Sequence, residues 1–243
     1  MTNRERYLRV LNFNMDIDRI PAMEWTPLWG ETVQRWRRDG LPEDIPYEAI
    51  KSYLGIDDIH TWMLVWPRGN DFPNLPYGHG CINNLKDYEK MILHMYPKNI
   101  VKENVSVYQE AAELQKSGDK VVGVILYGFF WWPRELFGME NFLYAFYDYP
   151  DVIHRINRDL LKYNCERVEE IFSIIKPDYF IISEDMCCKQ GPLISYKLFS
   201  EFMLPYYRKL VPKLKRFDSL LLMDTDGQFE PMIPWIIEAG LDG

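Results

Sequence analysis

Short apolar runs alternate along the chain with longer segments in which apolar residues recur every three or four positions. Runs that are rich in β-branched and aliphatic residues predict strands. They lie at Arg19–Trp25, Ile59–Trp66, Lys120–Tyr127, Asp178–Ser183 and Ser219–Met223. Their spacing leaves room for a helix after most of them.

The amphipathic segments between these runs predict helices. They cover Arg4–Leu11, Glu31–Arg38, Tyr47–Leu54, Asp87–Tyr96, Glu103–Lys116, Pro150–Ile175, Ser195–Arg216 and Glu230–Ala239, with a kink expected at Pro205. Because helices and strands alternate, the sheet should be parallel. No repeat, low-complexity tract or Gly/Ser-rich linker interrupts the pattern, so residues 1–243 are predicted to form a single domain.

Length and composition agree with one α/β domain. The chain has 243 residues, close to the ~250 of a (β/α)8 barrel, and 47% of them are hydrophobic. A net charge of -8 with scattered basic residues argues against nucleic-acid binding and against an anionic membrane surface. The charged start and the lack of any apolar stretch near ~18 residues predict no membrane span and a cytoplasmic location.

Several common site motifs receive little support. The four cysteines are expected to be reduced, because vicinal Cys187 and Cys188 suit no simple disulfide framework. His79-Gly80-Cys81 has the H-x-C form of half a zinc site, but its spacing to other cysteines matches no regular zinc module. No nucleophile elbow, P-loop or dinucleotide fingerprint occurs in the sequence.

Acidic residues follow the two clearest strands. Glu184-Asp185 comes directly after Asp178–Ser183, and Asp224-Thr225-Asp226 comes directly after Ser219–Met223. The carboxyl ends of parallel strands form the catalytic face of a barrel, and neighbouring strands lie ~4.8 Å apart. We therefore expect Glu184, Asp185, Asp224 and Asp226 to converge at one edge of the sheet.

Two interpretations of these acids are open. Clustered carboxylates raise one another's pKa and can serve as a general acid or base, and Asp224 with Asp226 could ligate a divalent metal. Alternatively, the two aspartates only shape the turn before the next helix, and Glu184 pairs with a cation. We favour the catalytic interpretation for all four acids.

Segments along the whole chain resemble the uroporphyrinogen decarboxylase superfamily. The opening RERYLRVLNF and DRIPAMEW are similar to the start of these proteins. Ser183-Glu184-Asp185-Met186, Gly191-Pro192-Leu193-Ile194-Ser195, and Phe199 with the run 202–206 (FMLPY) resemble the family's acid-containing strand end, G-P turn and L-P-Y helix. The final MDTDGQFEPMIPWIIEAGLDG also agrees with the family.

The resemblance implies a TIM barrel whose site lies at the carboxyl ends of the strands. The superfamily includes uroporphyrinogen III decarboxylases, which need no cofactor. It also includes methyltransferases that move methyl groups between a corrinoid protein and a thiol or another acceptor, commonly with zinc. On this reading the substrate, a small molecule or a corrinoid protein, would contact Glu24, Trp25, Trp29 and Trp131, with Trp132 as a further apolar wall. The alternative for these tryptophans is packing in the core.

Departures from the family's motifs bear on the choice between these activities. The decarboxylases carry M-R-Q-A-G-R where this chain has Met23-Glu24-Trp25-Thr26-Pro27, so the arginines that hold a polycarboxylate are missing there. The zinc methyltransferases carry H-x-C where this chain has Asp224-Thr225-Asp226. Two acids make a harder site that favours Mg2+ over Zn2+, or no metal.

The sequence ends at Ala239–Gly243, where the family begins another strand, so we expect a barrel that is incomplete at its C-terminus. An open sheet edge could be covered by a second copy in a homodimer. Our preferred function is corrinoid-linked methyl transfer. The alternatives are decarboxylation of uroporphyrinogen or a related polycarboxylate, favoured if Arg19, Arg35, Arg37 or Arg134 faces the cleft, and an inactive fragment or corrinoid-binding partner.

Overall fold

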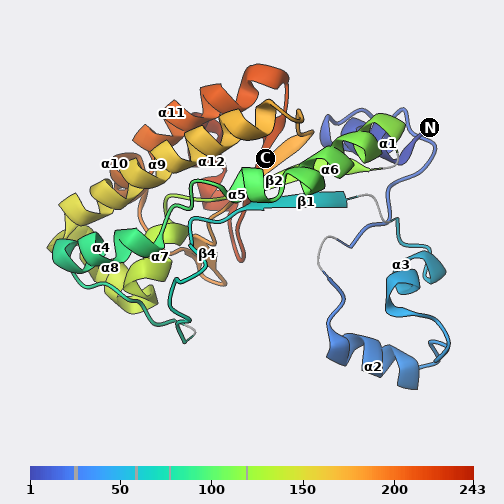
Figure 1. The fold of residues 1–243 in the computed structure, drawn as a ribbon, viewed down its shortest axis with the longest axis horizontal. Coiled ribbons are helices and arrows are strands. Elements are labelled where there is room, and N and C mark those ends of the chain that lie inside the picture. Colours follow the sequence, from blue (N-terminus) through green and yellow to red (C-terminus); the bar gives the residue numbers. More distant parts are fainter. Residues whose placement is uncertain (25–26, 58–59, 77, 119) are drawn as a thin grey trace. The chain divides into compact units, whose positions relative to one another are not determined.

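The computed structural model describes residues 1–24, 27–57, 60–76, 78–118 and 120–243 (Figure 1). Its internal contacts divide the chain into two compact units. The first comprises residues 1–61 and 110–122, and the second comprises residues 62–109 and 123–243. Each unit is described by itself, and the single-domain organisation stays a prediction.

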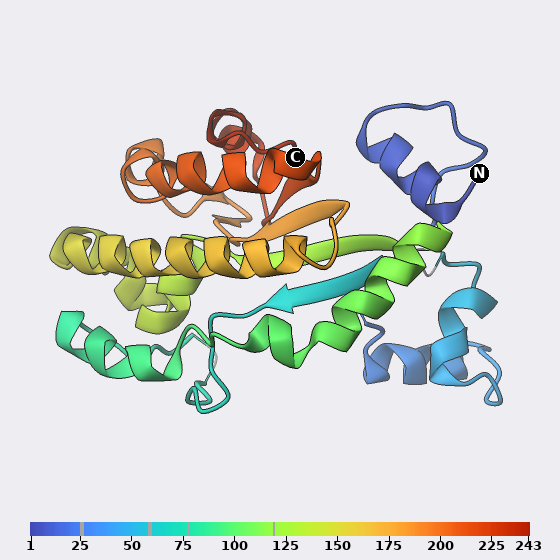
Figure 2. The ribbon, with the colours of Figure 1, turned by 45° about the horizontal axis from the view of Figure 1, so that its top comes forward.

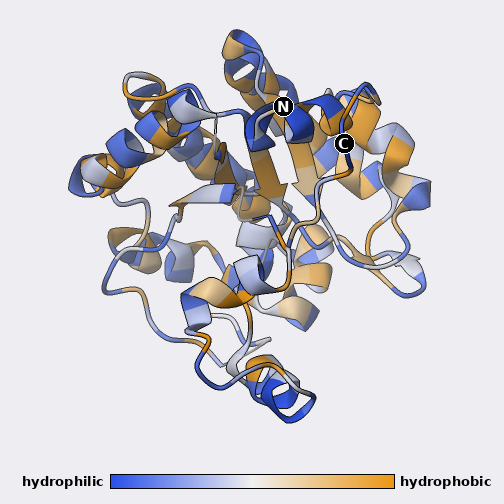
Figure 3. Ribbon diagram, turned by 90° about the vertical axis from the view of Figure 1, so that its right-hand side faces the viewer, coloured by the Kyte–Doolittle hydropathy of each residue, from blue (hydrophilic) through white to orange (hydrophobic). Residues whose placement is uncertain are grey.

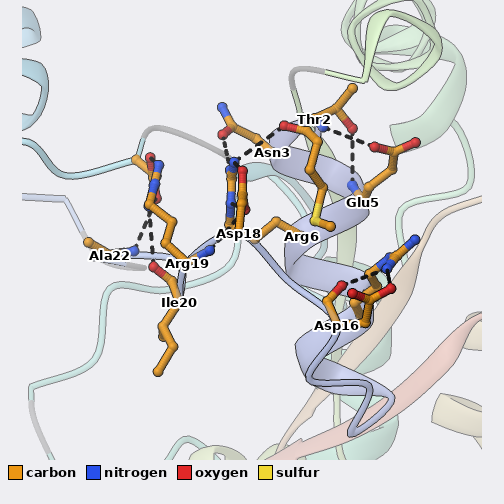
Figure 4. A network of polar contacts seen from close by, with 12 residues as sticks. Thr2, Asn3, Glu5, Arg6, Asp16, Asp18, Arg19, Ile20 and Ala22 are labelled. Carbon is orange, nitrogen blue, oxygen red and sulfur yellow. Dashed lines mark hydrogen bonds and ion pairs between the residues drawn. The ribbon is translucent and has the colours of Figure 1, made fainter.

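The first unit contains short helices joined by polar contacts. Its elements are α1 (Asn3–Leu11), α2 (Gly30–Arg38), η1 (Tyr47–Ala49), α3 (Ile50–Tyr53) and the later part of α6 (Val105–Ser117). Thr2 and Glu5 form a capping box at the start of α1. Arg6 donates from Nε and Nη2 to the two carboxylate oxygens of Asp18, both at 2.7 Å, which holds the pKa of Asp18 well below its usual range (Figure 4).

The strand predicted at Arg19–Trp25 is not formed by its described part, residues 19–24. A side chain takes the place of a neighbouring strand there. Asp57 accepts hydrogen bonds from Arg19 Nη1 at 2.6 Å and from the backbone of Ala22 at 3.0 Å, and its own N–H donates to the Ala22 carbonyl at 2.6 Å. Both backbone groups of Ala22 therefore bond to Asp57 instead of to a neighbouring strand. Trp25 lies outside the described residues.

A four-stranded sheet carries the fold. It contains β1 (His60–Val65), β2 (Val121–Tyr127), β3 (Tyr179–Ser183) and β6 (Leu220–Asp224), in the order β1-β2-β3-β6. The β2–β3 and β3–β6 pairings are parallel, as predicted from the alternation of elements. The two central strands, β2 and β3, are largely buried and apolar, which agrees with helices covering a parallel sheet (Figure 3).

The second unit is rich in helices. They are α4 (Leu85–Met91), η2 (Ile92–His94), α5 (Ile100–Glu103), α7 (Trp131–Phe137), α8 (Met139–Asp148), α9 (Pro150–Phe172), α10 (Tyr196–Phe202), α11 (Leu204–Leu214), η3 (Lys215–Phe217), η4 (Glu230–Met232) and α12 (Ile233–Ala239). The long helix α9 packs beside α11 (Figures 1 and 2). A short hairpin of β4 (Cys187–Cys188) and β5 (Gly191–Pro192) follows β3.

The predicted helix at Ser195–Arg216 is divided, but at Met203 rather than at Pro205. Met203 separates α10 from α11, and Pro205 lies in the first turn of α11. Proline is tolerated there because the first helical N–H groups have no partner within the helix. The break therefore precedes the proline.

The last residues continue the ladder beyond β6. Met223 N–H donates to the Gly243 carbonyl at 2.8 Å, and Asp242 N–H donates to the Leu221 carbonyl at 2.8 Å. An α/β fold with parallel strands is thus confirmed, while a closed barrel is not formed by the described strands. Within the described parts of the chain, no helix is both long and apolar enough to cross a membrane.

Candidate functional site

The acids after β3 and β6 lie next to each other, as the sequence predicted. Ser183 and Asp224 are register partners at the ends of these two strands. The N–H groups of Glu184 and Asp185 both donate to the carbonyl of Asp224, at 3.1 and 3.2 Å. The two acid-bearing turns are therefore joined by backbone hydrogen bonds at the carboxyl edge of the sheet.

Glu184 lies inside the protein, where it clamps the loop that follows β2. Its side chain is fully buried, and its carboxylate accepts hydrogen bonds from the N–H groups of Phe129, Phe130 and Trp131 at 2.8 to 2.9 Å. The hydroxyl of Tyr207 donates to the same carboxylate. We call residues 128–131 with Glu184 and Tyr207 the Glu184 clamp.

Gly128 allows this close approach. A Cβ at residue 128 would lie 2.0 Å from the carboxyl carbon of Glu184, so a side chain there would displace it. Burial raises the pKa of Glu184 to about 7, although the four hydrogen bonds act in the opposite direction. The clamp fixes the start of α7, which suits a positioning role for Glu184; its predicted catalytic role stays a prediction.

Asp185 sits at the edge of the site with an arginine beside it. Its backbone has a φ of 45°, in the left-handed region that few residues other than glycine adopt. Arg134 Nη1 donates to the Asp185 carbonyl at 3.2 Å, and Nη2 lies 3.6 Å from its carboxylate. Burial raises the pKa of Asp185, Arg134 lowers it, and the charge of Asp226 raises it.

Asp224 and Asp226 add two more carboxylates to this edge. Burial, followed by the charges of Asp185 and Asp226, raises the pKa of the partly buried Asp224. Asp226 is exposed. Three interacting carboxylates beside one arginine give a site that attracts cations, and burial with like charge makes Asp185 and Asp224 bind a proton more readily than an ordinary aspartate.

Trp131 contributes an aromatic face to the same edge. The guanidinium carbon of Arg134 lies 4.1 Å from the centroid of the Trp131 ring, a cation–π contact. The indole N–H of Trp131 donates to Glu135 at 2.8 Å, and Glu135 pairs with Arg68 at 2.6 Å. Trp131 is therefore a site residue by position, whereas Trp132 is fully buried in the core.

The site is built from residues 127–135, 183–186 and 224–227 of the second unit. Arg134 was considered in the sequence only as a ligand of a polycarboxylate, and Gly128 and Tyr207 were not singled out. The signal for Gly128 was present: the glycine directly follows the strand KVVGVILY and precedes a helix. Tyr207 had no comparable signal, because its partner is fixed only by tertiary packing.

The substrate-binding residues predicted near the N-terminus belong to the first unit. Trp29 is 74% exposed at the start of α2, and the backbone carbonyl of Glu24 accepts a hydrogen bond from Lys51 at 3.0 Å. Trp25 lies outside the described residues. Three arginines of this unit that were considered as polycarboxylate ligands have local partners: Arg19 binds Asp57, Arg35 pairs with Asp39, and Arg37 donates to backbone carbonyls.

The described residues do not provide a full set of metal ligands. Within the described ranges, no three His, Cys, Asp or Glu side chains gather closely enough to hold a metal ion. All four cysteines are free thiols, and burial raises the pKa of Cys81 to about 11, which disfavours a thiolate. Asp224 and Asp226 alone are fewer ligands than Zn2+ or Mg2+ requires.

Comparison with known proteins shows what this fold is similar to. No protein-family model matches the chain, and no curated protein matches its sequence. Four chains of solved structures match. One of them is a methyltransferase from Methanosarcina mazei, with a TM-score of 0.64 and 14% sequence identity over 100% of this chain and 75% of that one. At this identity the likeness shows a shared fold.

Proposed function

We propose that this chain is an enzyme of the uroporphyrinogen decarboxylase superfamily that transfers a methyl group between a corrinoid and an acceptor, and that its complete fold is a (β/α)8 barrel. The observation that carries the proposal is the meeting of Asp185 and Asp224 with the Arg134–Trp131 pair at the carboxyl ends of parallel strands. The fold shared with a methyltransferase supports it.

In this proposal the carboxylates handle the proton of the acceptor. A thiol or similar acceptor attacks the methyl group of the corrinoid with its lone pair, and the new bond forms as the cobalt–carbon bond breaks. Both electrons of that bond stay with cobalt. The proton of the acceptor passes to Asp224 or Asp185, because the pKa values of these two groups are raised above that of an ordinary aspartate.

Trp131 and Arg134 act as binding groups. The exposed part of Trp131 offers an apolar face for a flat ligand, and Arg134 can bind an anionic substituent when it leaves Asp185. A divalent metal at Asp224 and Asp226 would need further ligands. No step of the proposed reaction therefore passes through a metal.

The second candidate is decarboxylation of a polycarboxylate such as uroporphyrinogen. Arg134 favours it, because this arginine lies beside Asp185 at the strand-end site. One arginine faces three aspartates there, so the edge as a whole repels a polyanion. For this reason we place methyl transfer first.

The test uses the purified chain with methylcobalamin and 2-mercaptoethanol under anaerobic conditions. Methyl transfer is followed by loss of the methylcobalamin absorption, and binding is followed separately by quenching of tryptophan fluorescence. We expect transfer that falls at least tenfold in Asp224→Asn and is unchanged in Asp148→Asn, an exposed aspartate at the end of α8.

Other outcomes would overturn the proposal. Binding of a uroporphyrin without binding of methylcobalamin would favour the decarboxylase. Binding of methylcobalamin without transfer would make the chain a corrinoid-binding partner. Equal activity of Asp224→Asn and the unmodified chain would remove the strand-end acids from the reaction.

A further inference from the structure

A cavity lies against the middle of α9, and none of the strand-end acids lines it. Its volume is about 260 Å3. The lining side chains come from α9 and from the segment that includes η2, and all belong to the second unit: Ile92, Met95, Tyr96, Lys98, Asp159, Lys162, Tyr163 and Glu166. None of these residues takes part in the proposed methyl transfer.

The apolar wall of this cavity is held in place by hydrogen bonds. The rings of Tyr96 and Tyr163 lie 5.6 Å apart, beside the buried Met95. The Tyr163 hydroxyl donates to the Trp66 carbonyl at 2.7 Å, and the Tyr96 hydroxyl accepts from the Trp132 indole N–H at 3.0 Å. The Tyr88 hydroxyl lies 3.0 Å from that of Tyr96. Both rings are thus fixed before any ligand binds.

The rim of the cavity carries two cations and two anions. Lys98 and Lys162 stand with Asp159 and Glu166, so their formal charges cancel. The pair Lys162–Glu166 is loose, at 3.9 Å. Asp159 accepts from Tyr88 and Arg155 through the same oxygen, Oδ2, which keeps this carboxylate oriented. A ligand of a single charge would meet both an opposite and a like charge here.

We infer that this cavity binds a small zwitterion with an apolar side chain, the chemical class of an apolar α-amino acid. Its carboxylate would pair with Lys98 or Lys162, its ammonium with Asp159 or Glu166, and its side chain would pack on Tyr96 and Tyr163. The volume lies below the ~300 Å3 at which typical ligand pockets begin, and this restricts the ligand to a small metabolite.

The experiment titrates the full chain with L-phenylalanine by calorimetry and by ligand-observed NMR. Two probes each lack one charge: 3-phenylpropionate lacks the ammonium and phenethylamine lacks the carboxylate. Glycine lacks the apolar side chain. We expect saturable binding of L-phenylalanine, and binding at least tenfold weaker for each of the other three.

Variants locate the binding in this cavity. Lys98→Met combined with Lys162→Met should weaken L-phenylalanine binding at least tenfold, and Glu166→Gln should weaken it less. Lys209→Met, at an exposed lysine on α11, is the matched control and should bind as the unmodified chain does. Thermal unfolding of each variant shows whether it is folded.

Three results would overturn the inference. The first is that L-phenylalanine does not bind at concentrations up to about 10 mM, tenfold above a millimolar Kd. The second is that 3-phenylpropionate binds as tightly as L-phenylalanine, which would mean a simple anion site. The third is that the folded double lysine variant binds L-phenylalanine as tightly as the unmodified chain does. The titrations need no methylcobalamin. The titrations can therefore refute amino-acid binding in the cavity without affecting the proposed methyl transfer, and the methyl-transfer assay can refute that function without affecting the cavity.

Discussion

Replacing Glu184 by glutamine tests the Glu184 clamp directly, because the two side chains have nearly the same shape. Below its pKa of about 7, Glu184 is a neutral acid. Tyr207 donates to the ionised carboxylate, but when Glu184 is neutral the Tyr207 hydroxyl can rotate and accept from the Glu184 hydroxyl, which still accepts from Phe129 while the carbonyl oxygen accepts from Phe130 and Trp131. An amide NH2 in the position of the hydroxyl can donate to Tyr207 but cannot accept from Phe129.

The expected magnitude follows from this count of hydrogen bonds. Glu184→Gln leaves one buried N–H without an acceptor, which costs about 1–3 kcal/mol. At pH 5 we therefore expect the free energy of unfolding to fall by about 2 kcal/mol. Glu201→Gln, at an exposed glutamate on α10, should change it by less than about 0.5 kcal/mol.

The deficit of Glu184→Gln should shrink as the pH rises. The pKa of Glu184 is about 7 in the folded chain and 4.5 for an ordinary glutamate. Between these values the folded state holds a proton that the unfolded state has lost. The stabilisation is complete below pH 4.5 and is lost as the pH rises through 7, and between pH 5 and 8 this loss amounts to about 2–3 kcal/mol. Glutamine does not titrate, so the variant should approach the unmodified chain at pH 8.

Urea unfolding followed by tryptophan fluorescence at pH 5 and pH 8 measures both effects. A cost of Glu184→Gln below about 0.5 kcal/mol at pH 5 would show that other contacts hold the loop at 128–131. A deficit that grows with pH would show that the folded chain prefers the ionised carboxylate.

Three further predictions concern the same edge of the sheet. Gly128→Ala should lower the free energy of unfolding by about 1–3 kcal/mol, because the new Cβ would meet the Glu184 carboxyl group. Gly30→Ala, with open space around residue 30, should not lower the free energy of unfolding, and thermal unfolding of both variants makes the comparison. Arg134→Gln should raise the pKa of Asp185, since the arginine lowers it, and a carboxyl-carbon NMR titration measures this pKa. An unchanged pKa would show that Arg134, 3.6 Å away, does not stabilise the ionised carboxylate of Asp185. Asp226→Asn should lower the pKa values of both Asp185 and Asp224 in the same titration, and unchanged values would contradict the like-charge coupling.

The sequence predicted the features that depend on local pattern. The alternation of apolar runs and amphipathic segments identified β2, β3, β6 and α9, and the rule that parallel strands share a carboxyl edge brought Asp185, Asp224 and Asp226 together. The segment at 19–24 was misassigned, since its apolar residues satisfy the strand pattern while both backbone groups of Ala22 bond to Asp57.

What the sequence could not supply were contacts between distant positions. Glu184 was predicted to be a catalytic residue, a role that stays a prediction, and its carboxylate was not expected to bind the N–H groups of residues 129–131. Nothing in the residues around Glu184 indicates that its side chain turns inward. The same holds for Tyr207, which reaches Glu184 from α11 only after that helix has packed beside α9.

The Glu184 clamp also has a consequence for the order of folding. Phe129, Phe130 and Trp131 precede Glu184 by 53 to 55 residues along the chain, with α8 and α9 between them. Closing such a long loop is entropically unfavourable until the parallel ladder between β2 and β3 exists. We expect the strand-end site to be assembled late, after the central helices have formed, so a slow phase that reports on Trp131 should follow the gain of helical signal during refolding.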